Sequence, residues 1–406
     1  MSDNTQPNSE ISLLQRIRMT YEDSDAKAQL FKTKLHTVIT LVSLVIVVWA
    51  LFTIVQFFVT AEWQVISDKR RAFMIGRYPE EHVWRIWPTV WMFAGLAGLS
   101  SSLWLRPGKR MAISLFTAAV IISYLFLEFD SNALKFGFGL LLGLCGYALG
   151  YFTYTKISLN ALVVRIAVLG WILIIPVILI LLFIGDAPTT NYWGGLFVNV
   201  ILAAIAIVVG TPLAVVLALG RTTQGYPILQ IFSTAVIEVV RGAPLIAWLF
   251  MGRFVLPFIL PSWFGLNEAD VIIRTMIILI VFNAAYTAEV VRGGLQAIPK
   301  GQYEAASSVG FNYFQTLRLI LLPQALRAVL PSLINQYIGL FKDTTLVYLI
   351  SVVDVLEVGR KAFNELAYTG TALEVLVFVG FLFWIVTWSM SNLSKKVEEN
   401  LGLGTR

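Results

Sequence analysis

The sequence is poor in charged residues and almost free of cysteine. Only 13% of its 406 residues are charged, whereas 58% are hydrophobic, and the mean hydropathy is +0.78. A water-soluble domain usually carries about 25% charged residues, and so few charges cannot cover the apolar surface of a chain this long. The composition excludes soluble globular, disordered, collagen-like and disulfide-rich proteins, and it predicts a membrane protein with several spans.

The motifs of common enzymes are also missing. Cys145 is the only cysteine, and His36 and His82 lie far apart, so a disulfide, a His/Cys zinc site and a Cys–His nucleophile pair have no support. The only Gly-Lys pair, Gly108-Lys109, lacks the glycine that a P-loop places five residues earlier. There is no G-x-S-x-G or H-E-x-x-H motif. The net charge of +6 favours anionic lipid over nucleic acid as the acidic partner.

Ten apolar runs are long enough to cross a bilayer. A hydrocarbon core of about 30 Å needs about 20 apolar residues in a helix, and in lipid the backbone polar groups of such runs are satisfied only as helices. We therefore predict an all-α, polytopic integral membrane helix bundle. Its spans are expected at 36–58, 88–105, 111–128, 136–154, 166–184, 196–219, 231–251, 271–288, 324–341 and 371–391.

Lysine and arginine in the loops predict the orientation, because short cytoplasmic loops are enriched in them. If ten spans alternate from a cytoplasmic N-terminus, cytoplasmic segments hold 18 of the 30 bases and outer segments hold 9. Both termini are therefore expected in the cytoplasm. The 59–87 loop argues against this, because it carries five of the outer bases. The polar start of the chain lacks the layout of a cleaved signal, so the first span is expected to be retained.

A turn-rich stretch at 185–195 divides the chain into two halves without an internal repeat. The five spans before it carry few charges and predict no chemistry; a lipid-facing scaffold and a partner-docking bundle both fit them. After it, Glu238 and Arg241 lie three residues apart inside an apolar run, just before Pro244, which permits a kink. They form either a structural ion pair or part of a cavity lining. The same spacing recurs at Glu289-Arg292, where a solvated helix end explains it.

The longest cytoplasmic connection after the first span lies between the eighth and ninth spans. Proline at Pro299 is suited to a first helical turn, and a short helix of small residues is expected from Gly301 to Val309. Gly310 then provides a left-handed stop. Small side chains on a helix in water allow another protein to approach closely. The loop contains nothing catalytic.

The spacing within this loop carries a family resemblance. Glu304-Ala305-Ala306 is followed by three residues, Gly310, nine residues, Ile320, one residue and Leu322-Pro323. This resembles the EAA loop of permease subunits of ABC importers, EAA-x3-G-x9-I-x-LP. Segments at 193–196, 241–245, 288–294 and 340–346 resemble the polar amino acid uptake (histidine-type) branch, which more often has Thr at Ala243 and Ser at Thr345.

The resemblance covers about 191–395 and implies the domain organisation. We expect a cytoplasmic tail at 1–35, a membrane extension of about five helices at 36–190, a type I ABC importer transmembrane domain at 191–395 and a cytoplasmic tail at 396–406. The layout of the extension resembles the larger permease of general L-amino acid or glutamate/glutamine/aspartate/asparagine importers. A bacterial plasma (inner) membrane location follows from the family.

The resemblance also implies the partners. In the family the EAA helix docks on a separate cytoplasmic ATPase dimer, which holds ATP and Mg, so this chain needs no cofactor and is not an enzyme. A second permease subunit, expected to be a different chain because the two halves are unequal, and an extracytoplasmic amino acid-binding protein complete the unit. The residues expected to couple to the ATPase are Glu304, Ala305, Ala306, Gly310, Ile320, Leu322 and Pro323.

An amino acid zwitterion needs partners for both of its charges. The candidates for the pathway or its gate are Glu238, Arg241, Asn283, Lys342 and Asp343. From Gln324, 18 residues of helix cover about 27 Å, which places Lys342 and Asp343 near the outer mouth. An ion-coupled secondary transporter of small polar solutes is the alternative, but it predicts repeated halves and leaves the EAA loop unexplained. A membrane-embedded enzyme would need a nucleophile, a carboxylate dyad or a metal cluster.

Overall fold

The computed structural model describes residues 30–31, 33–104, 132–154, 157–223, 225–259 and 269–401, most of which are helical. Within these ranges there is no β-strand, only two isolated bridges, which join Gly76 to Trp193 and Gly195 to Asp354. The all-α prediction is confirmed. The chain divides into two compact units, Met1–Glu62 and Trp63–Arg406.

The first unit contains one long apolar helix, α3 (Lys34–Thr60), which contains the predicted span 36–58. Its start is defined by Thr33, whose side chain accepts a hydrogen bond from the backbone N–H of His36. None of its residues is buried within the unit, and its apolar side chains are exposed around the whole circumference. Such a surface is typical of a helix surrounded by lipid or by another membrane helix.

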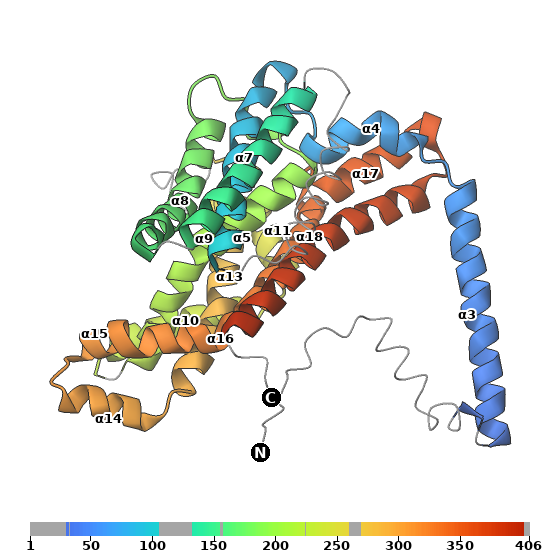
Figure 1. Ribbon diagram of the computed structural model, residues 1–406. Helices are drawn as coiled ribbons and strands as arrows, with labels where there is room; N and C mark the ends of the chain where they lie inside the picture. The colour runs from blue at the N-terminus through green and yellow to red at the C-terminus, as the bar shows by residue number, and fades with distance from the viewer. Residues whose placement is uncertain are drawn as a thin grey trace. The chain divides into compact units, whose positions relative to one another are not determined.

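The second unit is built almost entirely from helices (Figure 1). Its elements in chain order are α4 (Gln64–Ile75), η1 (Glu80–Arg85), α5 (Ile86–Trp104), α7 (Asn132–Tyr154), α8 (Ile157–Phe183), η2 (Thr190–Tyr192), α9 (Gly195–Thr222), α10 (Pro227–Arg241), α11 (Leu245–Phe250), η3 (Met251–Val255), α12 (Leu256–Ile259), α13 (Val271–Gln296), α14 (Lys300–Ser308), α15 (Tyr313–Thr316), η5 (Leu317–Leu321), α16 (Leu322–Asp343), η6 (Thr344–Ile350), α17 (Val355–Phe363), η7 (Leu366–Tyr368) and α18 (Ala372–Leu401).

Six described helices are long and apolar enough to cross a membrane, and a bent pair makes a seventh. The predicted spans 88–105 and 136–154 are the helices α5 and α7. Neither is among these six, and the apolar stretch found in the described residues of α7 is Leu141–Tyr151. The predicted span 111–128 lies outside the described residues. The predicted span 231–251 is not continuous, because α10 ends at Arg241 and α11 leaves it at 101°.

The break follows from the sequence Gly242-Ala243-Pro244. Pro244 cannot donate a hydrogen bond to the preceding turn, and its extended backbone (ψ 148°) begins a new helix at Leu245. The new direction is fixed by Trp248, whose Nε1 donates to the carbonyl of Val240 at 3.0 Å. The predicted kink is therefore a sharp corner between two half-helices.

The centre of the second unit is α13, which packs against α9 and α16. The paired contacts of α9 and α13 advance in the same direction along both helices: Ala206 meets Asn283, and Arg221 meets Glu289. The two helices are therefore parallel. At their crossing Gly210 has no side chain, and a Cβ there would lie 2.9 Å from the Nδ2 atom of Asn283.

Contacts between loops show which helix ends share a side of the second unit. The backbone N–H of Gly195 donates to Val353 at 3.0 Å, and Lys69 pairs with Glu365 at 2.7 Å. At the other end, Thr223 and Tyr313 share a hydrogen bond of 3.2 Å. In Figure 1, α4 and α17 accordingly lie at one end and α14 and α15 at the other. Residues 63–80 therefore share a side with the 185–195 loop, as the predicted alternation requires.

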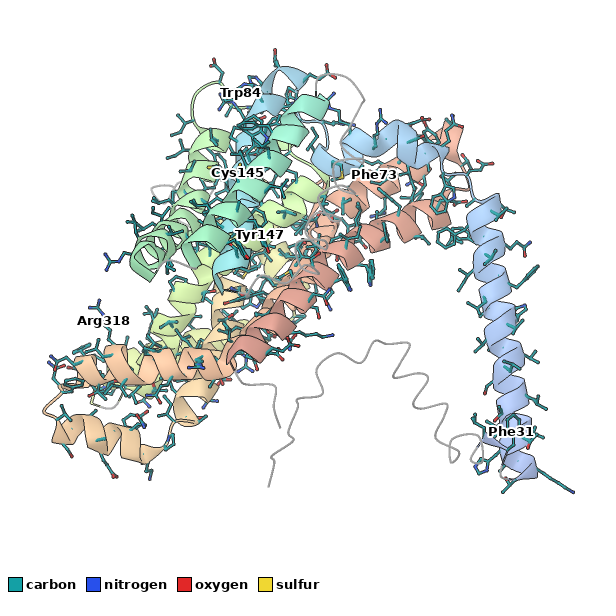
Figure 2. All side chains as sticks on the ribbon, in the orientation of Figure 1. Phe31, Phe73, Trp84, Cys145, Tyr147 and Arg318 are labelled. Carbon is teal, nitrogen blue, oxygen red and sulfur yellow. The ribbon has the colours of Figure 1, made fainter. Side chains whose placement is uncertain are left out.

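Helix α4 joins the extension to this core, and Arg85 holds two parts of the extension together. The Arg85 guanidinium donates from Nη1 to the carbonyls of Leu181 and Ile184, both at 2.8 Å, and so satisfies the C-terminal end of α8. Helix α4 buries Phe73, which is labelled in Figure 2. The ring of Phe73 packs edge-on against Phe378 of α18, with 5.1 Å between the ring centroids. These contacts fix the extension at the end of the unit opposite α14.

Candidate functional site

The loop that carries the EAA pattern forms the predicted short helix. Helix α14 begins after Pro299, which is its N-cap, and its C-cap is Val309. Gly310 follows with φ +84°, a left-handed conformation that favours glycine. The start and the end of α14 therefore agree with the helix predicted from Pro299 and Gly310.

The motif residues divide into an exposed and a buried set. Glu304 and Ala305 are exposed, whereas Ala306 is 2% exposed. Gly310 is exposed, and a Cβ there would meet nothing within 4 Å. This end of the unit also presents large apolar side chains to the outside, and Figure 2 shows Arg318 projecting from it. These exposed apolar residues are Tyr303, Val309, Tyr313 and Phe314.

The remaining coupling candidates lie where the loop enters the next span. Ile320 is half-buried and packs against the apolar cluster of α9, α13 and α16. Leu322 is half-buried in the first turn of α16, and Pro323 is exposed beside it. The amide of Gln324 donates to Gln302 at 3.2 Å, which ties the short helix to this span.

Five charged side chains from α9, α10 and α13 form an ionic cluster close to the broken helix. Arg221 lies 2.8 Å from Glu238 and 2.9 Å from Glu289, measured between nitrogen and oxygen. Glu289 also contacts Arg292 at 2.8 Å and Arg241 at 3.5 Å. We call these five residues the ionic cluster. It joins the last turn of α10 to the two central helices.

The ionic cluster corrects two interpretations of the sequence. Glu238 and Arg241 do not pair with one another in the described structure; each contacts a different neighbouring helix. Glu289 is not at a solvated helix end, because its side chain is only 14% exposed and contacts three arginines. Sequence reasoning missed Arg221. No local spacing relates it to its partners, which are 17 and 68 residues away.

The other pathway candidates occupy different positions. Asn283 is fully buried between α9 and α13, where it donates to the carbonyl of Ala206 at 2.9 Å and accepts from Thr287. Lys342 and Asp343 end α16, where Lys342 is exposed and Asp343 is half-buried. Glu238 and Arg241 therefore belong to the ionic cluster, whereas Asn283 and the Lys342-Asp343 pair lie elsewhere in the structure. Their part in transport stays a prediction.

A buried polar group near the start of α17 was also missed. Asn199 donates to Thr344 at 3.0 Å and to Asp354 at 3.2 Å, and Asp354 caps α17 by accepting from the Glu357 backbone at 2.8 Å. Burial raises the pKa of Asp354 to about 6, although these hydrogen bonds oppose the shift. The spacing of Asp354 and Glu357 is that of a capping box and marks the helix start in the sequence.

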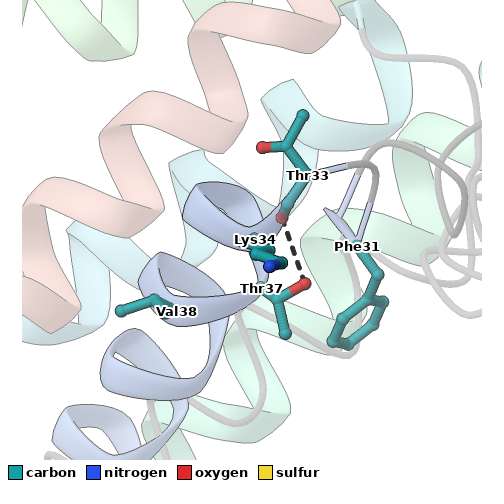
Figure 3. Close-up of a pocket in the computed structure, with 5 residues that line it drawn as sticks. All are labelled: Phe31, Thr33, Lys34, Thr37 and Val38. Atoms are coloured by element: carbon teal, nitrogen blue, oxygen red, sulfur yellow. Dashed lines mark hydrogen bonds between the residues drawn. The ribbon is translucent and has the colours of Figure 1, made fainter.

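Two hollows are described on the surface, and only the second is lined by charged groups of both signs. One lies at the start of α3 and is lined by Phe31, Thr33, Lys34, Thr37 and Val38 (Figure 3). There the Thr37 hydroxyl donates to the carbonyl of Thr33 at 3.2 Å, so this polar pair is already engaged. The other lies beside α4 and is lined by Asp68, Lys69, Arg71, Arg77 and Glu80, among other residues. Several of these charges are engaged: Lys69 pairs with Glu365, Arg71 pairs with Glu80, and Asp68 accepts a hydrogen bond from Tyr368.

Comparison with known proteins identifies the family. The model of the binding-protein-dependent transport system inner membrane component matches residues 210–399. The glutamate/aspartate import permease protein GltK of Escherichia coli is 35% identical over 201 residues, which are 49% of this chain and 88% of that protein. The chain belongs to this family. Its placement among inner membrane transport components agrees with the predicted resemblance.

Two further relatives of this inner membrane component are more similar in sequence. The inner membrane amino-acid ABC transporter permease protein YhdY of Escherichia coli is 41% identical over 240 residues, 58% of this chain. BztC of Rhodobacter capsulatus, a glutamate/glutamine/aspartate/asparagine transport system permease protein, is 42% identical over 213 residues, 52% of this chain. The matches span 64% of YhdY and 48% of BztC, less than two thirds of either.

A solved structure is similar to part of this chain. It is the crystal structure of an amino acid ABC transporter with histidines, which is 26% identical. The match covers 50% of this chain and 91% of that one, with a TM-score of 0.44.

Proposed function

We propose that the chain is the permease subunit of an ATP-driven importer that moves polar amino acids across the inner membrane. The observation that carries the proposal is the exposed short helix α14 at one end of the second unit, which has the full EAA spacing. Family membership supports it, and so do relatives named as permeases for glutamate, glutamine, aspartate and asparagine.

The partner at this helix is a cytoplasmic ATPase dimer that binds ATP and Mg. A helix that presents Glu304 and Ala305 beside exposed apolar side chains offers both a polar and an apolar contact. Phe314 and Val309 are 72% and 74% exposed, and exposed apolar side chains that gather in one region mark a protein interaction site. A second permease chain and an extracytoplasmic amino acid-binding protein complete the assembly, and both termini of this chain are cytoplasmic.

The structure supports a mechanical route from this helix to the broken span. The Tyr313 hydroxyl contacts Thr223 at 3.2 Å, directly after the end of α9. Arg221, two residues earlier, contacts Glu238 at the corner between α10 and α11. A displacement of α15 by the ATPase would therefore act on the corner through α9. Differential contacts of this kind are what a conformational change requires.

Two neighbouring glycines give a sharp test of coupling. Gly310 has φ +84°, and Gly301 lies inside α14; neither has an atom within 4 Å of its Cβ position. Gly310→Ala is strained by about 1–2 kcal/mol, which should tilt or fray the short helix, whereas Gly301→Ala should be neutral or slightly stabilising. We expect Gly310→Ala and Glu304→Lys to insert normally but to lose uptake and solute-stimulated ATP hydrolysis in proteoliposomes. Normal coupled uptake in both would refute the proposal.

The contact itself is tested by co-purification. Phe314→Ser should reduce the amount of ATPase that co-purifies with the permease, because it removes an exposed apolar contact. Leu366→Ser is the matched control, since Leu366 is 96% exposed at the opposite end of the unit. Equal co-purification of the two variants would contradict the assigned interface.

The alternative, an ion-coupled secondary transporter, makes an opposite prediction. It would take up solute in response to an ion gradient without any ATPase. Uptake by the permease alone, in vesicles with an imposed ion gradient, would favour that alternative. The family match does not favour it.

A further inference from the structure

Arg274 is a buried arginine without an acidic partner in the described part of the chain. It lies in the first turn of α13 and is 8% exposed. Its Nε atom has no hydrogen-bond partner among the described residues, and none of their carboxylates lies within salt-bridge distance of it. An arginine side chain that is largely buried and forms no ion pair is energetically unfavourable. Such a group inside a membrane protein marks a functional site.

A second arginine lies beside it. Gly252 packs so closely on α13 that a Cβ there would be 2.7 Å from the Ile278 side chain. Arg253 follows Gly252 in the π-helical turn, and Arg274 lies four residues before Ile278 on the same face of α13. The positive charge of Arg253 acts unfavourably on that of Arg274. Asp270 attracts Arg274, but its Oδ1 already accepts from the backbone of Ile272 at 2.8 Å.

Other arginines of the same unit are treated differently. Glu289 lies 15 residues after Arg274, about 22 Å further along α13 at 1.5 Å per residue. It pairs there with Arg292 at 2.8 Å and with Arg221 at 2.9 Å. Arg85, which is also 8% exposed, donates to two carbonyl oxygens. The fold thus supplies partners where arginine has a structural role, and Arg274 is an exception to this pattern.

We propose that Arg274, together with Arg253, forms a binding site for the carboxylate of a transported solute, at the end of the second unit that also holds Asp354. Guanidinium groups bind carboxylates through paired, charge-assisted hydrogen bonds. Helix α13 is the most enclosed of the described candidate spans, with 61% of its apolar window buried. Arg253 lies on a broken helix with a π-turn, a feature frequent at functional sites. The site rests on the proposed function, in which every solute carries an α-carboxylate.

The test compares Arg274→Gln, Arg274→Lys and Arg360→Gln in the assembled transporter. Arg360 is the control because its side chain is exposed at the same end. We expect Arg274→Gln to lower the uptake of labelled L-glutamine about tenfold or more, Arg274→Lys to recover part of it, and Arg360→Gln to behave as wild type. The melting temperature of Arg274→Gln should be unchanged or higher, because the substitution removes an unpaired buried charge. A structural arginine would give a lower melting temperature.

A second measurement identifies the source of the carboxylate. Without the binding protein, millimolar L-glutamine should raise the melting temperature of the wild-type permease–ATPase complex but not that of Arg274→Gln. 4-Aminobutanamide, which is glutamine without its α-carboxylate, should have no effect. A shift produced only by the binding protein would overturn the proposal, because the carboxylate would then belong to that protein.

A carboxylate of the same chain is the remaining source. Glu268 lies six residues before Arg274, outside the described residues. If Glu268→Gln and Arg274→Gln lower the melting temperature equally and the double variant is no worse, the arginine is paired within the chain and the proposal fails. Normal L-glutamine uptake by Arg274→Gln would also refute it. If the wild type transports no amino acid, the proposed function fails, and the thermal shift with L-glutamine still decides the site.

Discussion

Replacing Glu289 with glutamine would remove the one negative charge that three arginine side chains share. Its carboxylate contacts Arg221 at 2.9 Å, Arg292 at 2.8 Å and Arg241 at 3.5 Å, and its side chain is 14% exposed. Glutamine has nearly the same shape and keeps one acceptor oxygen. Three guanidinium groups would then face one another with only Glu238 left to neutralise Arg221. We therefore expect a loss of stability without a change of volume.

The magnitude follows from burial. Removing one partner of a buried ion pair costs about 3–5 kcal/mol, whereas an exposed pair is worth about 0–1 kcal/mol. The arginine side chains of the ionic cluster are 23–35% exposed, so solvent screens part of their repulsion. We expect Glu289→Gln to lower the free energy of unfolding by about 2–3 kcal/mol. Glu238→Gln is the control: that side chain is 57% exposed, and its loss should cost less than about 1 kcal/mol.

Thermal unfolding of the purified permease, followed by the fluorescence of its 12 tryptophans, measures both variants under the same conditions. A double-mutant cycle with Arg292→Gln should show coupling, since each partner stabilises the other. The assignment of Glu289 as the shared charge would be wrong if the two glutamine variants melted together. It would also be wrong if the effects of Glu289→Gln and Arg292→Gln were simply additive.

Two further predictions concern other parts of the fold. The pKa of Asp354 is raised from 3.8 to about 6, so the folded state binds the Asp354 proton more tightly than the unfolded state does. The free energy of unfolding should therefore fall as pH rises from about 4 to about 6, and it should stay level above that. The span is about two pKa units, or about 3 kcal/mol, and Asp354→Asn should abolish the dependence in melting curves taken between pH 4 and 7.5. Gly146→Ala in α7 should destabilise the fold by about 1–3 kcal/mol, because the new Cβ would lie 2.4 Å from the carbonyl oxygen of Gly95. Gly380→Ala in α18 is the control: its Cβ would meet nothing within 4 Å, so the substitution should be neutral. Equal melting temperatures for the two alanine variants would contradict the close approach of α5 and α7.

Sequence reasoning predicted the elements whose physics is local. Apolar runs of about 20 residues must be helical in lipid, so α3, α8, α9, α13, α16 and α18 follow from hydropathy. The start and stop of α14 follow from Pro299 and Gly310, whose backbone preferences act within a few residues. The corner after Arg241 was expected only as a kink. Its 101° angle depends on Trp248 and on packing against α13, which no local rule supplies.

The candidate site was harder to predict because its contacts are long-range. The spacing of Glu238 and Arg241 placed both residues correctly on one helix, yet their partners come from α9 and α13. The i,i+3 rule identifies neighbours on a helix surface and is silent about a third charge from elsewhere in the chain. Arg221 shows this most clearly, since its role depends on how α9 ends beside α10. Arg274 is not among the residues that the sequence singles out, because the lack of an ion-pair partner is visible only in three dimensions.

Helix α4 explains why the 59–87 loop is the strongest exception to the positive-inside rule in this chain. Three of the five bases of the 59–87 loop do not lie in an extended loop but in the amphipathic helix α4, which buries Val65 and Phe73. Lys69 pairs with Glu365, and Arg71 pairs with Glu80. The rule describes free loop charges and gives acids little weight. A base that is packed on a folded helix and paired with an acid of the same end carries less information about orientation. The backbone hydrogen bond between Gly195 and Val353 is a better guide to which loops share a side, because it joins this end to the later loops and does not depend on charge.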